Sequence, residues 1–494
     1  MSRNPIKSLA GQTVVYGMGT IVPRLLNYLL VPVYTRIFQD QATYGQITEL
    51  YAYVAFLLVL LTYGMETAFF RFAQKHSPSQ VFNNATSSIL LTTGLFVLIS
   101  ALFYNEFACW LHYDGNSSYI LIVVLIVAFD AVTAIPFAML RKQNRARKFA
   151  IVRLVNVGFT LLLNFLTIIW FPEYFLKLGK ELLGPETGLV VWVFISNLLA
   201  SALSLAMLSE TFRSFRFTIS KEILKPMLHY AWPILIIGLA GMVNEMLDKI
   251  LLKYLIPTEK QPMAQLGIYG ANYKLGVLMT LFIQMFRYAA EPFFFAEAEK
   301  KNAPELFARV MNYFVISGLI IFLGVTLFMD VFKLFIGSGY REGLHIVPII
   351  LMANLFNGIY YNLAIWYKLT DRTGSGALIA VGGALITIAL NFALIPPFGY
   401  YGAAWAHLTV YLLMMLCSFF WGQRVYFIPY NSFRILAYFA LALAVYHLCG
   451  MLKAQPVTIR LILNGLGLLL FSLLAFWIEA RQHRLSAKME NAGQ

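Results

Sequence analysis

Residues 11–38 read GQTVVYGMGTIVPRLLNYLLVPVYTRIF, an apolar stretch of membrane-spanning length with Arg24 close to its midpoint. At helical spacing, polar side chains share a side with Arg24, whereas aliphatic side chains fill the other side. A central arginine in a spanning helix costs roughly 2.5–3.5 kcal/mol on insertion scales, so such a residue usually faces a polar cavity or a partner. Pro23 cannot donate a backbone hydrogen bond and favours a bend next to Arg24. The stretch therefore predicts one wall of a polar, movable cavity.

The composition of the whole chain is that of a membrane protein. Of 494 residues, 60% are hydrophobic and only 12% are charged, whereas soluble domains carry about 25% charged residues. The three cysteines show no C-x-x-C spacing and the histidines do not cluster, so neither a disulfide framework nor a metal site is expected.

Apolar windows of about 20 residues, the length that crosses a bilayer as a helix, recur fourteen times along the chain. They lie near residues 12–35, 45–70, 82–104, 118–140, 149–171, 188–209, 227–250, 265–290, 306–329, 345–367, 376–396, 402–421, 433–450 and 459–479. The sequence therefore predicts an all-α polytopic membrane protein with fourteen transmembrane helices. The first apolar run is too long for a signal peptide and is expected to be retained.

Lysine and arginine are distributed unequally between the two sides of the predicted membrane. With a cytoplasmic N-terminus, the inside segments hold 22 of these residues and the outside segments hold 9. This asymmetry predicts that both termini lie in the cytoplasm, with the protein in the cytoplasmic (inner) membrane. Basic loops lying against anionic headgroups account for much of the net charge of +14, so no nucleic-acid partner is expected.

The segments between the spans are too short for a soluble catalytic domain. None exceeds about twenty residues, whereas a domain needs about 50 or more. No glycine loop of the form G-x-x-x-x-G-K-[ST] occurs, so we expect no cofactor. Energy for transport would then come from coupling to H⁺ or Na⁺, from the membrane potential or from consumption of the product.

Two pairs of segments repeat within the chain in the same orientation. Residues 42–51 (ATYGQITELY) match residues 264–273 (AQLGIYGANY), and residues 141–165 match residues 368–392, with Asn164-Phe165 aligned on Asn391-Phe392. The offsets of 222 and 227 residues nearly agree, as expected for a transporter built from two related halves.

The repeat predicts six helices followed by six. The expected domains are an N-terminal lobe (residues 1–210, helices 1–6), a C-terminal lobe (211–424, helices 7–12) and a final segment with helices 13–14 and a cytoplasmic tail (425–494).

The most polar spans are the first, second, seventh and eighth, which the repeat relates to one another. The candidate cavity cations on these helices are Arg24, Lys249, Lys274 and Arg287. Lys249 and Lys274 could instead reach the headgroups with their long side chains. The candidate coupling or gating carboxylates are Glu49, Glu66, Asp130, Asp248 and Glu291. Asp130, in the fourth span, could equally form a structural hydrogen bond to a neighbouring helix.

Four local motifs occur in order along the chain. They are GMETAFFRF (64–72), IPFAMLR (135–141), LGIYGANYKLG (266–276) and LNFALIPPFGYYGAA (390–404). Together with the fourteen spans and the cationic first helix, they resemble the polysaccharide transporter (Wzx-type flippase) branch of the multidrug/oligosaccharidyl-lipid/polysaccharide (MOP) superfamily. The likeness extends over nearly the whole chain.

This resemblance implies two six-helix lobes in a V around a central cavity, with alternating access. It also implies the cargo, an isoprenoid diphosphate carrying a short glycan, which moves to the outer leaflet for synthesis of surface polysaccharide or lipopolysaccharide. A buried guanidinium can hold a diphosphate through paired hydrogen bonds, so Arg24 and Arg287 would bind it, together with Lys249 and Lys274. The implied partners are the lipid-linked oligosaccharide, membrane lipids, and possible polysaccharide polymerases and glycosyltransferases.

Other functions use the same substrates or the same superfamily. A membrane-embedded glycan polymerase or ligase commonly needs a sizeable outer loop, but segments 105–117, 172–187 and 252–264 are short and carry no D-x-D cluster. A scaffold without transport would not need costly polar groups in four particular helices. A lipid II flippase or a drug/cation antiporter would share the superfamily, although a cationic cavity does not suit an exporter of cationic drugs. We therefore expect a transporter rather than an enzyme.

The distribution of basic residues generates a prediction about topology. Reporter fusions at the C-terminus and at Asn116 should report opposite compartments, with the C-terminus inside. The measurement is the activity of paired reporters that work only in the cytoplasm or only outside it. Two fusions on the same side would contradict the predicted fourteen helices.

Overall fold

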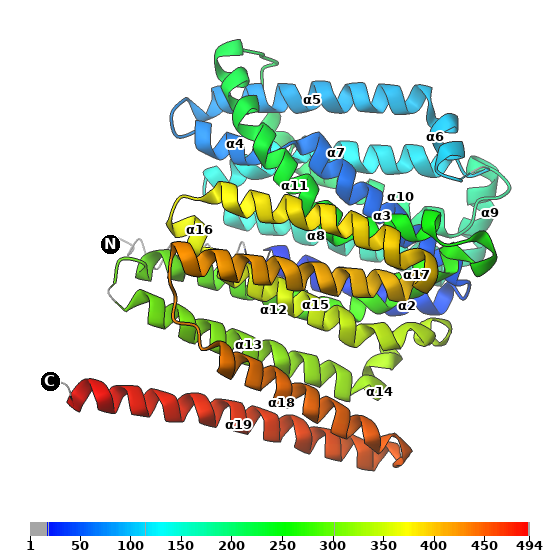
Figure 1. Cartoon of the computed structure of the whole chain (residues 1–494). Helices are drawn as coiled ribbons and strands as arrows, with labels where there is room; N and C mark the ends of the chain where they lie inside the picture. Colours follow the sequence, from blue (N-terminus) through cyan, green and yellow to red (C-terminus); the bar gives the residue numbers. More distant parts are fainter. Residues whose placement is uncertain (1–16, 18, 114, 301, 493–494) are drawn as a thin grey trace. The chain divides into compact units, whose positions relative to one another are not determined.

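The computed structural model describes residues 17, 19–113, 115–300 and 302–492 (Figure 1). Within these ranges all regular structure is helical and no strand occurs, so the predicted all-α class is confirmed. The beginning of the predicted first helix, residues 12–16, lies outside the described residues. The chain forms two compact units, residues 1–267 and 268–494.

The first unit begins with a helical segment over residues 19–28. It continues with α2 (Leu30–Ile37), α3 (Gln41–Thr62), α4 (Met65–Phe72), α5 (Pro78–Leu102), α6 (Tyr104–Trp110), α7 (Ser118–Lys142), α8 (Ala146–Asn164), the π-helix η1 (Phe165–Trp170), α9 (Pro172–Leu183), α10 (Val190–Met207), η2 (Ser209–Phe212), α11 (Lys221–Leu255), η3 (Thr258–Lys260) and the start of α12 (Pro262–Glu297).

The second unit contains the rest of α12 and the helices that follow it. They are α13 (Ala303–Leu327), α14 (Met329–Phe332), η4 (Lys333–Phe335), η5 (Ser338–Ile346), α15 (Val347–Leu363), α16 (Ile365–Leu369), α17 (Thr373–Val425), α18 (Ser432–Gly450), η6 (Met451–Ala454) and α19 (Val457–Ala492).

In the described part of the chain, eleven helices are long and apolar enough to cross a membrane, which makes this a multi-pass membrane protein. One of them, α17, has 53 residues and breaks at Gly399 (φ 58°, ψ −140°), between two of the predicted spans. Helix α11 matches the predicted span 227–250 but is not among the eleven. The number fourteen therefore stays a prediction.

The predicted span 45–70 lies within one candidate membrane span, Gln41–Phe72. This span turns at Tyr63 and Gly64, whose φ angles of 32° and 72° end α3 before α4 begins. A Cβ at Gly64 would lie 2.9 Å from Ile234, so this turn requires glycine both for its conformation and for space. The predicted outer segment 172–187 contains a further helix, α9.

The core of the first unit lies where α4, α5, α7 and α11 meet. Phe69, Ala85, Ala131 and Met227, one from each helix, are fully or almost fully buried there. Although the repeat places α11 at the start of the second lobe, this helix packs on α3, α4 and α5 within the first unit. The predicted lobe boundaries, after residues 210 and 424, therefore stay a prediction from the sequence repeat.

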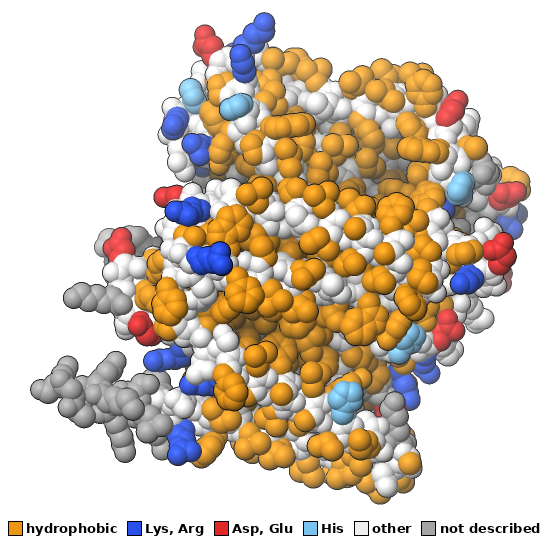
Figure 2. All heavy atoms as spheres, in the orientation of Figure 1, with side chains coloured by type: hydrophobic (Ala, Val, Ile, Leu, Met, Phe, Trp, Pro, Cys, Tyr) orange, Lys and Arg blue, Asp and Glu red, His pale blue; other side chains and the backbone are white. Residues whose placement is uncertain are grey.

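Large hydrophobic side chains also face outward, as expected for helices that contact lipid. Leu95 on α5 is 57% exposed and Leu378 on α17 is 66% exposed. Figure 2 shows hydrophobic side chains across the middle of the visible face, with charged side chains toward its margins. This is the distribution that a hydrocarbon layer favours.

In the second unit, α15 packs along α17, and α13 packs against both α18 and α19. Gly318 on α13 allows close packing, because a Cβ there would lie 2.3 Å from Leu355 on α15. Just after the C-terminal end of α13, Asp330 on α14 pairs with Lys333 and with Arg460 on α19. The pKa of Asp330 is lowered by the hydrogen bond from Lys333 and by the charge of Arg460.

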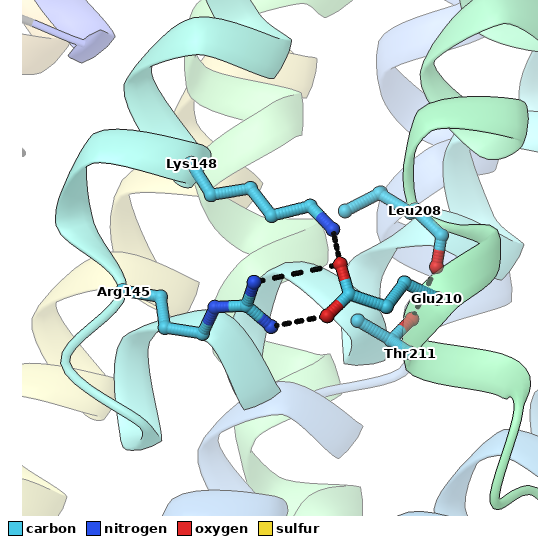
Figure 3. Close-up of polar contacts among 5 residues, drawn as sticks. All are labelled: Arg145, Lys148, Leu208, Glu210 and Thr211. Carbon is cyan, nitrogen blue, oxygen red and sulfur yellow. Dashed lines mark hydrogen bonds and ion pairs between the residues drawn. The ribbon is translucent and has the colours of Figure 1, made fainter.

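A salt bridge ties the start of α8 to η2, the short helix that follows α10 (Figure 3). Arg145 donates from Nη1 and Nη2 to the two carboxylate oxygens of Glu210, at 3.0 and 3.4 Å, and Lys148 pairs with Oε2 of the same carboxylate. These basic residues belong to the densest basic segment of the chain, residues 141–148. The hydrogen bond from Lys148, followed by that from Arg145, lowers the pKa of Glu210 to about 2.

This salt bridge predicts a specific titration. Because the folded-state pKa of Glu210 lies below its ordinary value of 4.5, the contact is intact above that value and is lost as pH falls through about 2. The carboxylate infrared band that disappears in Glu210→Gln should titrate with a midpoint near pH 2. In the variant Arg145→Gln/Lys148→Gln the midpoint should rise toward 4.5. An unchanged midpoint in that variant would contradict the assignment.

Candidate functional site

The segment that carries Arg24 packs against α8. A Cβ at Gly19 would lie 3.0 Å from the Cα of Ala150, so glycine allows the two helices to approach closely. Pro23 is buried and Arg24 is exposed. The helix continues through Pro23 and is interrupted at Leu29, whose amide donates to Leu26 O at 3.0 Å.

This packing brings Arg24 near Arg153, which lies one helical turn beyond Ala150 on α8. The two positive charges are close enough to repel each other, and Arg153 is attracted by Asp130 on α7. Its guanidinium also lies 4.1 Å from the ring centroid of Phe137. Asp130 accepts a hydrogen bond from the side chain of Ser201 on α10. We call Arg24, Asp130, Arg153 and Ser201 the arginine cluster.

The arginine cluster has two guanidinium groups and one carboxylate, a formal charge of +1. Like charges in a poorly solvated region are costly unless a counter-charge is present. A ligand with two or more negative charges would add counter-charge and could accept paired hydrogen bonds from a guanidinium. The arrangement therefore suits a phosphate-containing ligand.

Neutral polar groups on neighbouring helices of the same unit are already paired. The side chain of Tyr34 donates to Asn164 Oδ1 at 2.7 Å, and Asn197 Nδ2 donates to the hydroxyl of Tyr51 at 3.0 Å. These pairs join α2 to α8 and α10 to α3. Amides and aromatic hydroxyls of this kind are also the groups that meet sugar hydroxyls in binding sites.

A buried ion pair joins α3 to α11. Lys253 Nζ donates to both carboxylate oxygens of Glu49 at 3.1 Å and to Leu111 O at 2.6 Å. The hydroxyl of Tyr113 donates to Glu49 Oε2 at 2.7 Å. Glu49 is completely buried and the Lys253 side chain is only 7% exposed. The additional hydrogen bonds offset the cost of removing both charges from water.

Two repeat-related glycines, one on α3 and one on α12, mark a close contact between the backbones of these helices. Gly45 and Gly267 occupy equivalent positions in the two matched segments. A Cβ at Gly45 would lie 2.1 Å from Met263 O, and a Cβ at Gly267 would lie 1.9 Å from Gln41 O. The starts of α3 and α12 can therefore approach only because both positions lack a side chain.

The other predicted residues of the first unit lie in separate places. Lys249 is buried and donates to Glu245 O at 2.7 Å and to Asp248 Oδ1 at 3.1 Å. Glu66 pairs with Arg141, whose guanidinium also lies 4.9 Å from the centroid of a phenylalanine ring on α4.

In the second unit, Arg287 on α12 lies 4.0 Å from the ring centroid of Tyr361. One turn further along, Glu291 accepts a hydrogen bond from Lys368 at 2.5 Å. These four residues line one small cavity of about 20 Å³. Lys274 lies on the same helix and is exposed. Each predicted carboxylate in either unit thus has a basic partner or neighbour.

Two functional candidates were missed in the sequence. Arg153 lies in a span, and the same argument that singled out Arg24 could have found it. Lys253 falls in the predicted outer segment 252–264, and its position near the end of an apolar run gives no sign of a buried partner. Among the described residues, no group of three or more His, Cys, Asp or Glu could hold a metal ion.

Comparison with known proteins places the chain in a family. A sequence profile described as "Polysaccharide biosynthesis protein" matches residues 9–298, more than half of the 494-residue chain. The protein therefore belongs to the polysaccharide biosynthesis protein family. No curated protein matches the sequence at a significant level.

Solved structures share the fold. A structure described as "Lipid II flippase MurJ, inward closed conformation" matches with a TM-score of 0.67 and 14% identity, over 93% of this chain and 98% of that chain. An inward-facing MATE family transporter of the MOP superfamily matches with a TM-score of 0.58 and 11% identity, over 83% of this chain and 97% of that chain. At such identities the likeness shows the fold alone. This shared fold agrees with the resemblance to the MOP superfamily that the sequence motifs indicate.

The ion pair between Glu49 and Lys253 predicts an asymmetric response to mutation. Lys253→Met leaves a buried carboxylate without its cation and should destabilise the protein by about 3–5 kcal/mol. The double variant Glu49→Leu/Lys253→Met removes both charges and should recover much of that loss. The measurement is thermal unfolding of the purified protein in detergent. The control is Lys177→Met, which breaks an exposed pair with Glu181 and should change little. A double variant no more stable than Lys253→Met would contradict this account.

Proposed function

We propose that the protein moves an isoprenoid-diphosphate-linked oligosaccharide from the inner to the outer leaflet of the cytoplasmic membrane by alternating access. The glycan would then enter surface polysaccharide or lipopolysaccharide synthesis. Membership of the polysaccharide biosynthesis protein family supports this type of cargo. The flippase described for the first of the solved structures acts on lipid II, which is also a lipid-linked glycan.

The charge of Asp130 acts on Arg153, within a bundle of apolar helices. The observation that carries the proposal is the positive charge that Arg24 and Arg153 bring near each other there. A diphosphate would balance that charge, and planar guanidinium groups bind phosphate oxygens in pairs more specifically than ammonium groups do. The glycan would meet polar and aromatic side chains, while the isoprenoid tail would stay in the bilayer.

The proposal includes an energy source and partners. We expect transport to need no bound cofactor and to be coupled to H⁺ or Na⁺ or to the membrane potential. Asp130 would then be a candidate for coupling, because a proton or sodium ion there would alter the net charge that the diphosphate meets. Glycosyltransferases that make the lipid-linked glycan and a polymerase that uses it are the expected protein partners.

A drug/cation antiporter is the alternative that the MATE likeness raises. Such a transporter would bind cations, which a cluster with a formal charge of +1 repels. The charge of the cluster therefore favours the anionic, lipid-linked cargo.

The test is replacement of Arg24, with export measured per folded protein. Arg24→Ala removes the charge and the paired hydrogen-bond donors. A hydrogen bond to a charged group contributes about 1.5–3 kcal/mol, so we expect export to fall roughly 10–100-fold. Arg24→Lys keeps the charge but not the paired geometry and should retain partial activity. Arg213→Ala, at an exposed position outside the spans, is the matched control.

The assay follows the lipid-linked glycan in the two leaflets of cells that lack the native gene and carry each variant. Loss of export should be accompanied by accumulation of the intermediate on the inner leaflet, at unchanged membrane abundance of the variant. Wild-type export by Arg24→Ala at normal abundance would remove the basis of the proposal.

A further inference from the structure

A second polar site lies in the second unit, where α13, α18 and α19 pack side by side (Figure 1). A cavity of about 290 Å³ opens between the start of α13, the connection before α18 and the C-terminal part of α19. Glu305, Arg309, Asn312, Arg434 and Glu479 line it. All three segments lie on the side that the distribution of basic residues predicts to be cytoplasmic.

Glu479 is the most buried charged group of this cavity, at 5% exposed. Its Oε1 accepts hydrogen bonds from Tyr438 at 2.6 Å, Asn312 at 3.2 Å and Arg434 at 3.3 Å. Among the described residues, none donates to the second carboxylate oxygen, Oε2. Hydrogen bonds to Oε1 therefore hold the carboxylate in place, and Oε2 can accept a further hydrogen bond.

Arg309 supplies the opposite charge. It lies in the second turn of α13, is exposed and lines the cavity. Within the described ranges, no side chain forms an ion pair with it, although Glu305 lies one turn earlier on the same helix. A guanidinium at the edge of a spanning helix binds phosphate through several N–H groups. The cavity thus presents the guanidinium of Arg309 together with the carboxylate of Glu479.

The surroundings of the cavity suit a lipid. Phe433 and Leu436 on α18 and Leu473 on α19 are 85%, 66% and 61% exposed. Tyr313, which lines the cavity, stacks on Phe476 of α19 with ring centroids 6.5 Å apart. A headgroup in the cavity would therefore continue into acyl chains lying on an apolar surface.

We propose that this cavity binds the zwitterionic headgroup of a phospholipid with a primary amine, such as phosphatidylethanolamine, in the cytoplasmic leaflet. The phosphate would accept hydrogen bonds from Arg309, and the ammonium group would donate to Glu479 Oε2 and Glu305. The two arginines and two carboxylates balance in formal charge, so a purely anionic headgroup would be repelled by the carboxylates. A choline headgroup carries no N–H to donate. The volume fits a small headgroup rather than a lipid-linked oligosaccharide.

The experiment measures lipid binding to the purified full-length protein by native mass spectrometry and by thermal stabilisation. Matched phosphatidylethanolamine, phosphatidylcholine and phosphatidylglycerol are compared with the soluble probe glycerophosphoethanolamine. Wild type should prefer phosphatidylethanolamine over the other two lipids, and the soluble probe should bind weakly. Equal binding of phosphatidylglycerol would overturn the zwitterionic assignment. Equal binding of glycerophosphoethanolamine would assign the site to a free solute instead of a lipid.

Two variants locate the site. Arg309→Gln should weaken binding of phosphatidylethanolamine about tenfold, as expected for loss of one charged hydrogen bond. Glu305→Gln should reduce the preference for phosphatidylethanolamine over phosphatidylglycerol. The matched control is Arg481→Gln, since this exposed arginine on α19 stacks on Trp477 and does not line the cavity. Unchanged binding in Arg309→Gln, or an equal loss in Arg481→Gln, would overturn the proposal.

Discussion

Charge in a low-dielectric environment is the constraint on which the interior of this protein depends. Where α3 meets α11, Glu49 and Lys253 are buried together, and Tyr113 and a backbone carbonyl complete their hydrogen bonds. Neither side chain could remain charged there alone, because the free-energy cost of removing a single charge from water would exceed the stabilisation from its remaining contacts. The pair therefore specifies which surfaces of the two helices face each other, and the glycine contact at Gly45 and Gly267 specifies how closely the neighbouring backbones approach.

The arginine cluster departs from this balance. Most buried or membrane-embedded charges in the described chain have a partner of opposite sign, such as Glu66 with Arg141 or Glu291 with Lys368. Arg24 and Arg153 instead bring two positive charges near each other, and the charge of Asp130 acts on Arg153. A protein can tolerate such an excess where a ligand or water completes the site. This is why we consider the cluster, rather than the neutralised pairs, as the place where an anionic cargo binds.

The lipid-facing surface follows a different rule. Backbone groups are satisfied within helices, and side chains toward the hydrocarbon are large and apolar. Polar groups at the ends of such helices lie where they can meet headgroups. The cavity between α13, α18 and α19 is of this kind, and it lies in a different unit from the arginine cluster. The transported lipid and a bound structural lipid would thus be recognised by separate sets of arginines.

The amino-acid sequence by itself determined the all-α class, the multi-pass architecture and the family, because apolar length and local motifs are properties of contiguous segments. It also singled out Arg24, since a charge in the middle of a span is visible without any partner. Only the tertiary structure could show that Arg153 lies near Arg24 and that Lys253 neutralises Glu49 across 204 residues of sequence. The reason is physical: whether a charge is costly, neutralised or available to a ligand depends on atoms within a few ångströms, and helix packing supplies these from distant parts of the chain.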